Sequence, residues 1–315
     1  MNLLREIDSP GYPEDYLIAR IMGRRAALDA NWSDARTHGL PSASSDERIW
    51  EVLLQELEWL YGQMNWTLRK CFAPVFVLLE LKTIVLCLRN KEAGRRSEIE
   101  LLLTHTLLAD PLRRALREQP DVPSSIAALT VVSAGALPGI CEAAAAGAEQ
   151  GPRAFEDSLM RGYLECTVKT SLHPAIRQFF RAFIDLRNVM ILYKQLRWGM
   201  DDPGAFIDGG TFERARLVRL RETKQPGAWE ELAKEATVRK SLPDAAIEGA
   251  LETVLLTSLT QRLRQLGQDY SGQGGDGVAL LLDYIWRTYV HARNLAVLYH
   301  AAGMSDAAME RELIA

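Results

Sequence analysis

One ten-residue pattern occurs three times along this chain, and it constrains the fold more than any other feature. The copies are residues 80–89 (ELKTIVLCLR), 185–194 (DLRNVMILYK) and 291–300 (HARNLAVLYH). Each copy starts with a polar residue, has a basic residue two positions later, and ends in a basic or potentially basic side chain after a mostly apolar run. Repetition of this kind indicates similar helical units that pack on one another, because a single unit cannot bury its apolar face alone.

The repeat extends upstream of the pattern itself. Each copy is preceded by a predicted helix in which a glutamate follows an apolar residue: Glu51, Glu156 and Glu248. From this glutamate to the basic residue of the copy there are 31 residues in the first unit (82 − 51) and 31 in the second (187 − 156). The third separation is 45 (293 − 248), because a glycine-rich stretch adds length. We therefore predict three helical-hairpin subdomains, at residues 1–120, 121–222 and 223–315.

Hydrophobic periodicity predicts helices throughout. Residues 16–28 alternate apolar side chains such as Leu17 and Ile21 with arginines at helical spacing. Ser45 can cap the next helix, Pro74 is expected to separate that helix from the first copy, and residues 97–100 have the form of a capping box. No alternating strand pattern and no Asn-Gly hairpin is present. The predicted fold class is all-α.

Composition excludes several classes of protein. About half of the residues are apolar and a quarter are charged, the balance of a globular chain with a substantial core. A net charge of −4 leaves no basic excess for nucleic acid. The four cysteines, Cys71, Cys87, Cys141 and Cys166, are too widely spaced for a metal or redox motif, so we expect buried free thiols.

No stretch of the sequence predicts a membrane span. Residues 122–141 carry no charge, but they are rich in small residues and contain Pro123 and Pro138. The first ten residues lack the apolar core of a signal peptide. These features favour a soluble chain in which residues 122–141 form a tightly packed, bent helical segment.

The signals for catalysis are weak. Residues 272–277 match G-x-G-x-x-G, but a dinucleotide site needs a strand before the glycines and an amphipathic helix precedes them here. A flexible loop is the favoured interpretation, with a dinucleotide-binding enzyme as the alternative. The five histidines have no metal-ligand spacing. We predict no catalytic, cofactor or metal site.

The polar positions of the repeat are the remaining candidates. Asparagine is a poor helix former, yet two of the predicted helices hold one at the same place in the pattern. Either each asparagine bonds a neighbouring helix and fixes the hairpin, or these polar residues line a shared surface where three helices converge. The candidate positions are Lys82, Arg89, Asp185, Arg187, Asn188, Lys194, Arg293, Asn294 and His300.

With these features the chain resembles the family of C subunits of V-type and archaeal-type rotary ATPases, whose eukaryotic members are called d subunits. The similarity lies in Tyr16 followed by Ala19-Arg20 and further arginines, in the pattern of residues 185–194, and in Arg293-Asn294-Leu295 followed by Gly303 and a short acidic helix. Two positions depart from the family pattern. Thr83 stands where asparagine is expected, and His291 stands where an acid is expected.

The resemblance implies a funnel of three pseudo-symmetric helical subdomains. A protein of this family is a socket between the central stalk and the membrane proteolipid ring, resting on the ring's cytoplasmic loops and passing torque between ATP turnover and ion movement. It is expected to be non-catalytic, free of cofactors, cytoplasmic and peripheral to the membrane. The alternative is a generic helical scaffold that binds some other protein.

Overall fold

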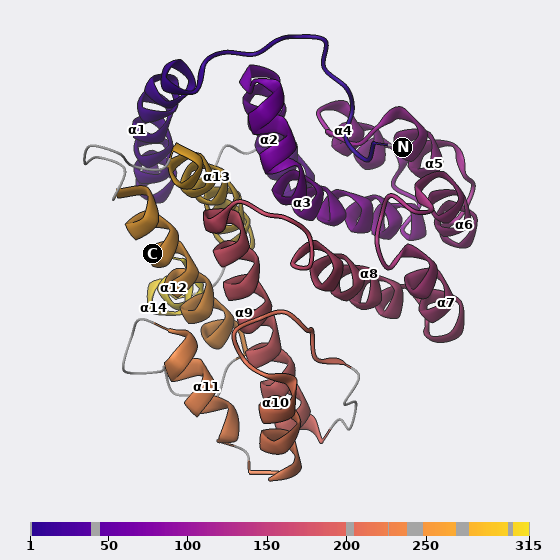
Figure 1. The fold of residues 1–315 in the computed structure, drawn as a ribbon, viewed down its shortest axis with the longest axis vertical. Helices are drawn as coiled ribbons and strands as arrows, with labels where there is room; N and C mark the ends of the chain where they lie inside the picture. The colour runs from indigo at the N-terminus through magenta and orange to yellow at the C-terminus, as the bar shows by residue number, and fades with distance from the viewer. Residues whose placement is uncertain are drawn as a thin grey trace. The chain divides into compact units, whose positions relative to one another are not determined.

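A computed structural model describes residues 2–38, 45–199, 205–225, 227–237, 248–268, 277–301 and 305–314. These residues form helices and no strand, with only two isolated β-bridges, so the predicted all-α class is confirmed (Figure 1). The helices are α1 (Glu14–His38), α2 (Asp46–Gln63), α3 (Trp66–Glu92), α4 (Arg96–Thr104), α5 (Asp110–Glu118), α6 (Val122–Ser133), α7 (Ile140–Gln150), α8 (Pro152–Thr167), α9 (Pro174–Trp198), α10 (Arg214–Glu222), α11 (Ala228–Ala236), α12 (Glu248–Gln268), α13 (Gly277–His300) and α14 (Asp306–Glu312).

The chain divides into two compact units. Unit 1 consists of Met1–Met22 and Pro41–Thr170, and unit 2 of Gly23–Leu40 and Ser171–Ala315. One division therefore falls inside α1, whose first half belongs to unit 1 and whose second half belongs to unit 2. The other falls between α8 and α9. The threefold division at 1–120, 121–222 and 223–315 stays a prediction.

Unit 1 is built around α3. This helix buries one large side chain after another, among them Phe72, Phe76 and Ile84, and α4 packs against both α2 and α3. The α7–α8 pair forms an antiparallel helical hairpin at the other side of the unit, and α6 contacts both α3 and α7. The small-residue stretch that the sequence places at 122–141 is indeed a helix, α6, followed by a bend at which Gly135 and Gly139 have positive φ.

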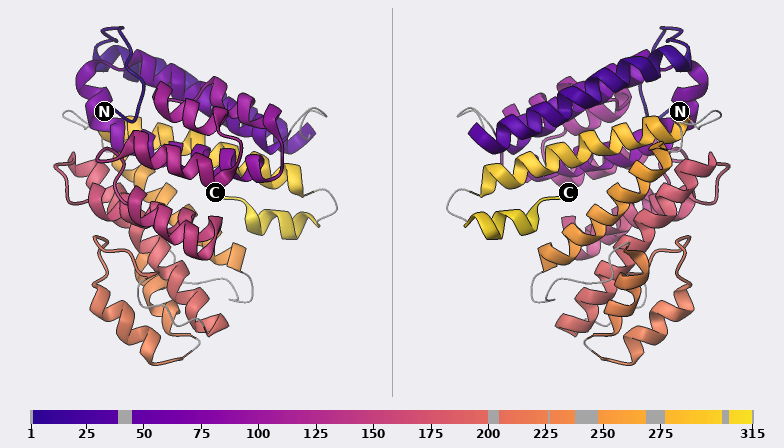
Figure 2. Two further views of the ribbon diagram at one scale, coloured as in Figure 1. Left: turned by 90° about the vertical axis from the view of Figure 1, so that its right-hand side faces the viewer. Right: turned by 90° about the vertical axis from the view of Figure 1, so that its left-hand side faces the viewer.

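Unit 2 is built around α9, α12 and α13, which all contact one another. Trp286 of α13 lies edge-on to Phe179 of α9, with ring centroids 5.6 Å apart, and Tyr193 meets Trp229 of α11 at 5.1 Å. The second half of α1 runs alongside α13 (Figure 2). Helix α13 carries the third copy of the repeat and packs against α12.

Two predicted helix boundaries are wrong. Pro74 does not separate two helices but lies inside α3, and the break comes earlier, where Asn65 caps α3 by accepting the Leu68 N–H at 3.0 Å. The carbonyl of Pro74 accepts a hydrogen bond from the Tyr163 hydroxyl at 2.7 Å. The expected capping box is also absent, since α4 starts at Arg96 and has no side-chain cap. Ser45 does cap α2, as predicted.

Among the described residues, only α3 is long and apolar enough to cross a membrane by length and composition, and α6 is apolar but shorter. The apolar window of α3 is 67% buried inside the protein, as in the core helix of a globular unit. The α3 helix also carries Glu80 and Arg69 in buried positions, which a lipid-exposed helix would not tolerate.

All four cysteines are free, but the prediction that they are buried is correct only for Cys87. Cys71 is half-buried, and Cys141 and Cys166 are exposed because they lie on the outward faces of α7 and α8.

Candidate functional site

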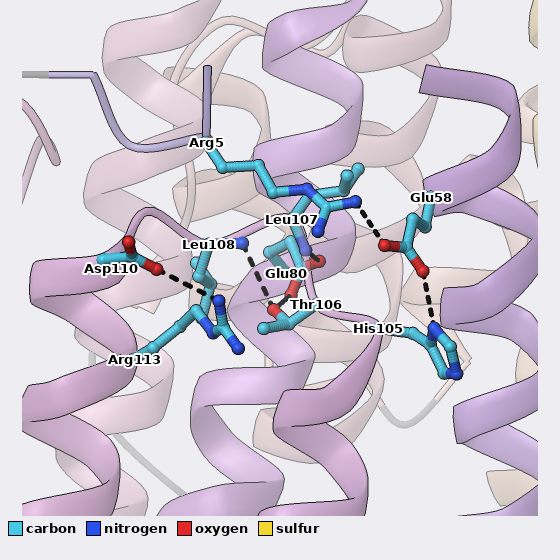
Figure 3. Close-up of polar contacts among 9 residues, drawn as sticks. All are labelled: Arg5, Glu58, Glu80, His105, Thr106, Leu107, Leu108, Asp110 and Arg113. Carbon is cyan, nitrogen blue, oxygen red and sulfur yellow. Dashed lines mark hydrogen bonds and ion pairs between the residues drawn. The ribbon is translucent and has the colours of Figure 1, made fainter. Parts of the chain in front are cut away.

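The first polar residue of copy one holds a segment of chain that lies further along unit 1. Glu80 is buried in α3, and its carboxylate accepts the Leu107 N–H at 2.6 Å and the Thr106 hydroxyl at 2.6 Å (Figure 3). Burial raises the pKa of Glu80, and the hydrogen bonds from Thr106 and Leu107 oppose this rise. The acid therefore fixes the α4–α5 connection onto α3.

Asp185 makes the equivalent contact in copy two. Its carboxylate accepts the N–H groups of Thr211 at 2.7 Å and Phe212 at 3.2 Å, and it also accepts the Thr211 hydroxyl. The bonded residues lie 26 and 27 positions after the acid, as in copy one. Burial likewise raises the pKa of Asp185, against the hydrogen bonds from Thr211 and Phe212.

A second contact is shared by copies two and three. Asn188 donates to the carbonyl of Ile207 at 2.9 Å and accepts the Ile207 N–H at 2.8 Å. Asn294 does the same with Ile314, at 2.9 Å and 3.0 Å. Both asparagines are buried, and each satisfies both backbone groups of one residue 19 or 20 positions downstream. These asparagines bind returning irregular chain, whereas the sequence suggested a neighbouring helix.

The two departures from the family pattern have their own contacts. Thr83, which replaces asparagine in copy one, accepts the indole N–H of Trp50 at 3.2 Å. His291, which replaces the acid in copy three, packs edge-on against Trp32 with ring centroids 6.2 Å apart. Copy two thus has both the acid contact and the asparagine contact, copy one has only the first, and copy three has only the second.

The basic residues at the third position of the copies have different surroundings. Lys82 is exposed, with its ammonium 4.4 Å from the ring centroid of Trp50. Arg187 lies 6.0 Å from the Phe183 ring, one turn earlier on its own helix. Arg293 donates to the Glu312 carbonyl at 3.2 Å. That these three occupy superimposable places stays a prediction.

The basic residues that end the copies also differ. Arg89 binds both carboxylate oxygens of Glu156, at 2.9 and 2.5 Å, and the hydrogen bond from Arg89 to Glu156 raises the pKa of Arg89. Lys194 is half-buried on α9, and His300 is exposed beside Tyr299. The basic residues of the three copies thus contact different parts of the chain. A shared surface formed by the nine candidate positions stays a prediction.

The sequence did not reveal a further network in unit 1, where the N-terminal segment is tied to the chain that Glu80 holds. The N–H of Arg5 donates to Leu107 at 2.8 Å, and the Arg5 guanidinium bonds Glu58 at 2.5 Å (Figure 3). Glu58 also bonds the His105 ring at 2.5 Å. Burial acts to raise the pKa of Glu58, but the hydrogen bonds from Arg5 and His105 outweigh it and lower that pKa. No local pattern marks these residues, because they come from three distant segments.

Within the described ranges, no group of three or more His, Cys, Asp or Glu side chains is arranged to hold a metal ion. Gly272 to Asp276, most of the G-x-G-x-x-G match, lie outside the described residues. Helix α12 precedes this match and α13 begins at Gly277, so a helix stands where a dinucleotide site has a strand.

The chain that makes these repeated contacts matches a known protein family along most of its length. A family model described as ATP synthase (C/AC39) subunit matches residues 30–309. The chain belongs to this family. Proteins of the C/AC39 family are subunits of V/A-type rotary ATPases, which are membrane-associated complexes. The matched residues include all three copies of the repeat. No curated protein sequence matches the chain.

In this C/AC39 family member, the acid and asparagine contacts are internal. Each one joins a long helix to backbone of the same unit and so positions that chain. Their chemical role is to satisfy backbone donors and acceptors that irregular, buried chain cannot pair by itself.

Proposed function

We propose that this chain is the non-catalytic rotor component that couples the central stalk of a V/A-type rotary ATPase to its membrane proteolipid ring. The observation that carries the proposal is the family match across residues 30–309. The protein lies on the cytoplasmic side, peripheral to the membrane, and transmits torque between ATP turnover and ion transport.

The internal contacts support this role physically. A torque-transmitting part must keep its shape under load, so its connecting segments need to be fixed to its long helices. Glu80, Asp185, Asn188 and Asn294 do this with buried hydrogen bonds to backbone. Buried bonds of this kind are stronger than exposed ones because the surroundings are less polar.

The coupling role is tested by removing the chain from the complex. Membrane vesicles with the complete complex should show ATP-driven ion uptake. Vesicles lacking only this chain should lose that uptake, while the released catalytic head still hydrolyses ATP. Purified chain added back should restore uptake, and it should co-elute with the proteins of the central stalk or with the ring. Uptake that persists without the chain contradicts the proposal.

Disulfide cross-linking distinguishes whether this chain belongs to the rotor or to the stator of the complex. Cys141 and Cys166 are the exposed thiols, so Cys141→Ser with Cys166→Ser gives a background for new single cysteines on the surface. A disulfide to a protein of the central stalk should leave ATP turnover unchanged, because the two parts rotate together. A disulfide to a stationary component should stop turnover until it is reduced. The reverse result places the chain in the stator. Capture of partners unrelated to rotary ATPases from solubilised membranes supports the scaffold alternative.

A further inference from the structure

Unit 1 exposes a cluster of aromatic rings where the start of α1 meets the α2–α3 corner. Trp66 is 71% exposed, Tyr16 is 48% exposed and Tyr12 is 42% exposed. Tyr12 and Tyr16 contact each other with ring centroids 4.8 Å apart. We call this cluster, together with Trp59, Arg20 and Lys70, the aromatic corner.

Backbone contacts hold the aromatic corner together. The N–H of Tyr12 donates to the Gln63 carbonyl at 2.9 Å, and the Tyr12 carbonyl accepts the Asn65 side chain at 3.5 Å. Gly11 approaches Met64 so closely that a Cβ there would lie 2.2 Å from the Met64 carbonyl oxygen. The segment before α1 is therefore pinned against the residues that precede Trp66, which brings Tyr12 close in space to the start of α3.

Two cations lie on this surface beside the rings. Arg20 donates to Gln63 at 2.9 Å, and its guanidinium lies 5.1 Å from the Trp59 ring and 5.9 Å from the Tyr16 ring. Lys70 lies 5.2 Å from the Trp66 ring. Both side chains are exposed, and no acid is bonded to either within the described part of the chain. Their charges are available to an incoming anion.

We propose that the aromatic corner docks a segment of a protein partner that places an aspartate or glutamate against Arg20 or Lys70 and an apolar side chain among the exposed rings. Tryptophan, tyrosine and arginine are the residue types that dominate the energetics of protein interfaces. Exposed apolar area gathered in one place is typical of an interaction site. Such a segment would dock here whether or not the chain acts as a rotor component.

A lipid surface is a poorer fit than a peptide. Glu14 and Asp15 lie in the first turn of α1, between the two tyrosines. An anionic bilayer presents phosphates across its whole plane, so it would bring negative charge against these carboxylates as well as against the cations. A peptide can place its carboxylate at Arg20 or Lys70 alone.

The test uses the full chain in its native complex, with the photo-cross-linker p-benzoylphenylalanine in place of Thr67, an exposed residue next to Trp66. The expected product is a single protein adduct whose mapped peptide carries an aspartate or glutamate close to the cross-linked residue. The control has the same cross-linker in place of Val131, which is 78% exposed on α6 in the same unit and should not give this adduct.

Reversing the charges of Arg20 and Lys70 gives a second test. Arg20→Glu with Lys70→Glu should lower the adduct yield about tenfold, as should raising the salt from about 0.05 M to about 0.5 M. Changing the partner's mapped acid to arginine should restore the yield with the reversed chain. Trp66→Ala should lower it without the salt dependence changing. A lipid adduct, an adduct to a segment without acids, no adduct, or a yield that ignores charge reversal each overturns the proposal.

Discussion

Asn188 and Asn294 hold their chain in the same way, since each pairs both the N–H and the C=O of a single downstream residue, Ile207 and Ile314 respectively. The pairing copies one bridge of an antiparallel sheet, with the side-chain amide in place of a strand. It allows a returning segment to be buried without a helix or strand of its own. The same position in copy one is Thr83, which binds a tryptophan side chain.

Removing either asparagine side chain should destabilise unit 2. Asn188→Ala and Asn294→Ala each leave a buried N–H and C=O without partners, at a cost of about 2 kcal/mol or more in the free energy of unfolding. Urea denaturation followed by circular dichroism measures this change. The matched control, Asn31→Ala, lies on the exposed surface of α1 and should not destabilise the protein, because alanine is the better helix former. Equal effects at all three positions contradict the role assigned to the pairing.

Glu80 should make the protein less stable as pH rises. Burial raises its pKa in the folded chain, so the folded state binds the proton more tightly than the unfolded state. The contribution to stability is complete below the ordinary carboxyl pKa of about 4 and is lost as pH rises through the folded pKa. Glu80→Gln resembles the neutral acid and should flatten this dependence, whereas Glu80→Ala should destabilise at every pH. Urea midpoints across the acidic range distinguish the two variants.

The end of α1 should separate from unit 2 when salt is added. None of residues 23–37 is fully buried, and the contacts to α13 and α14 include those of Arg25, Asp29, Trp32 and Arg36, which share one helix face. Salt screens exposed ion pairs such as Arg36–Glu310 much more than buried ones. Hydrogen exchange in residues 30–37 should therefore speed up about tenfold between about 0.05 M and about 0.5 M salt. Exchange in the buried part of α9 should not change. Asp283→Asn should produce the fast exchange already at low salt.

His291 should add a pH dependence of the opposite sign. Burial lowers its pKa, so the unfolded chain takes up a proton before the folded chain does. The stabilising contribution of the neutral ring is present above the ordinary histidine pKa of about 6.5 and is lost as pH falls. His291→Phe keeps the ring contact with Trp32 and should abolish this loss. The exposed His300→Phe is the control and should leave the dependence unchanged. Thermal melts between about pH 7 and about pH 5 compare them.

No side chain should be tolerated at Gly139 or Gly162, where the start of α7 lies against α8. A Cβ at Gly139, where φ is +78°, would lie 2.7 Å from the Gly162 Cα, and one at Gly162 would lie 2.6 Å from the Gly139 Cα. Gly139→Ala and Gly162→Ala should each cost about 3 kcal/mol by overpacking. Gly23→Ala, in an exposed helical position with open space around it, should instead stabilise by about 1 kcal/mol. A melting series of the three variants checks the contrast.

The sequence predicted the features that depend on near neighbours. Helical periodicity is local, so the all-α class and the helices that carry the three copies were predictable, as was the Ser45 cap three residues from its donor. The helix break predicted at Pro74 is wrong because α3 begins earlier, at the Asn65 cap, and its buried side chains hold it as one helix through the proline. The capping box at residues 97–100 failed because α4 begins one residue before the serine that was to cap it.

The sequence by itself determined the triple repeat, its order along the chain and the positions of its polar residues. Only the tertiary structure decided what those residues do. Glu80, Asp185, Asn188 and Asn294 bind backbone 19 to 27 residues downstream, and any residue type can present a backbone N–H or C=O, so no pattern marks the partner. Long-range pairing of this kind is set by how the chain returns to its helix, which is a property of the packed unit and not of the segment.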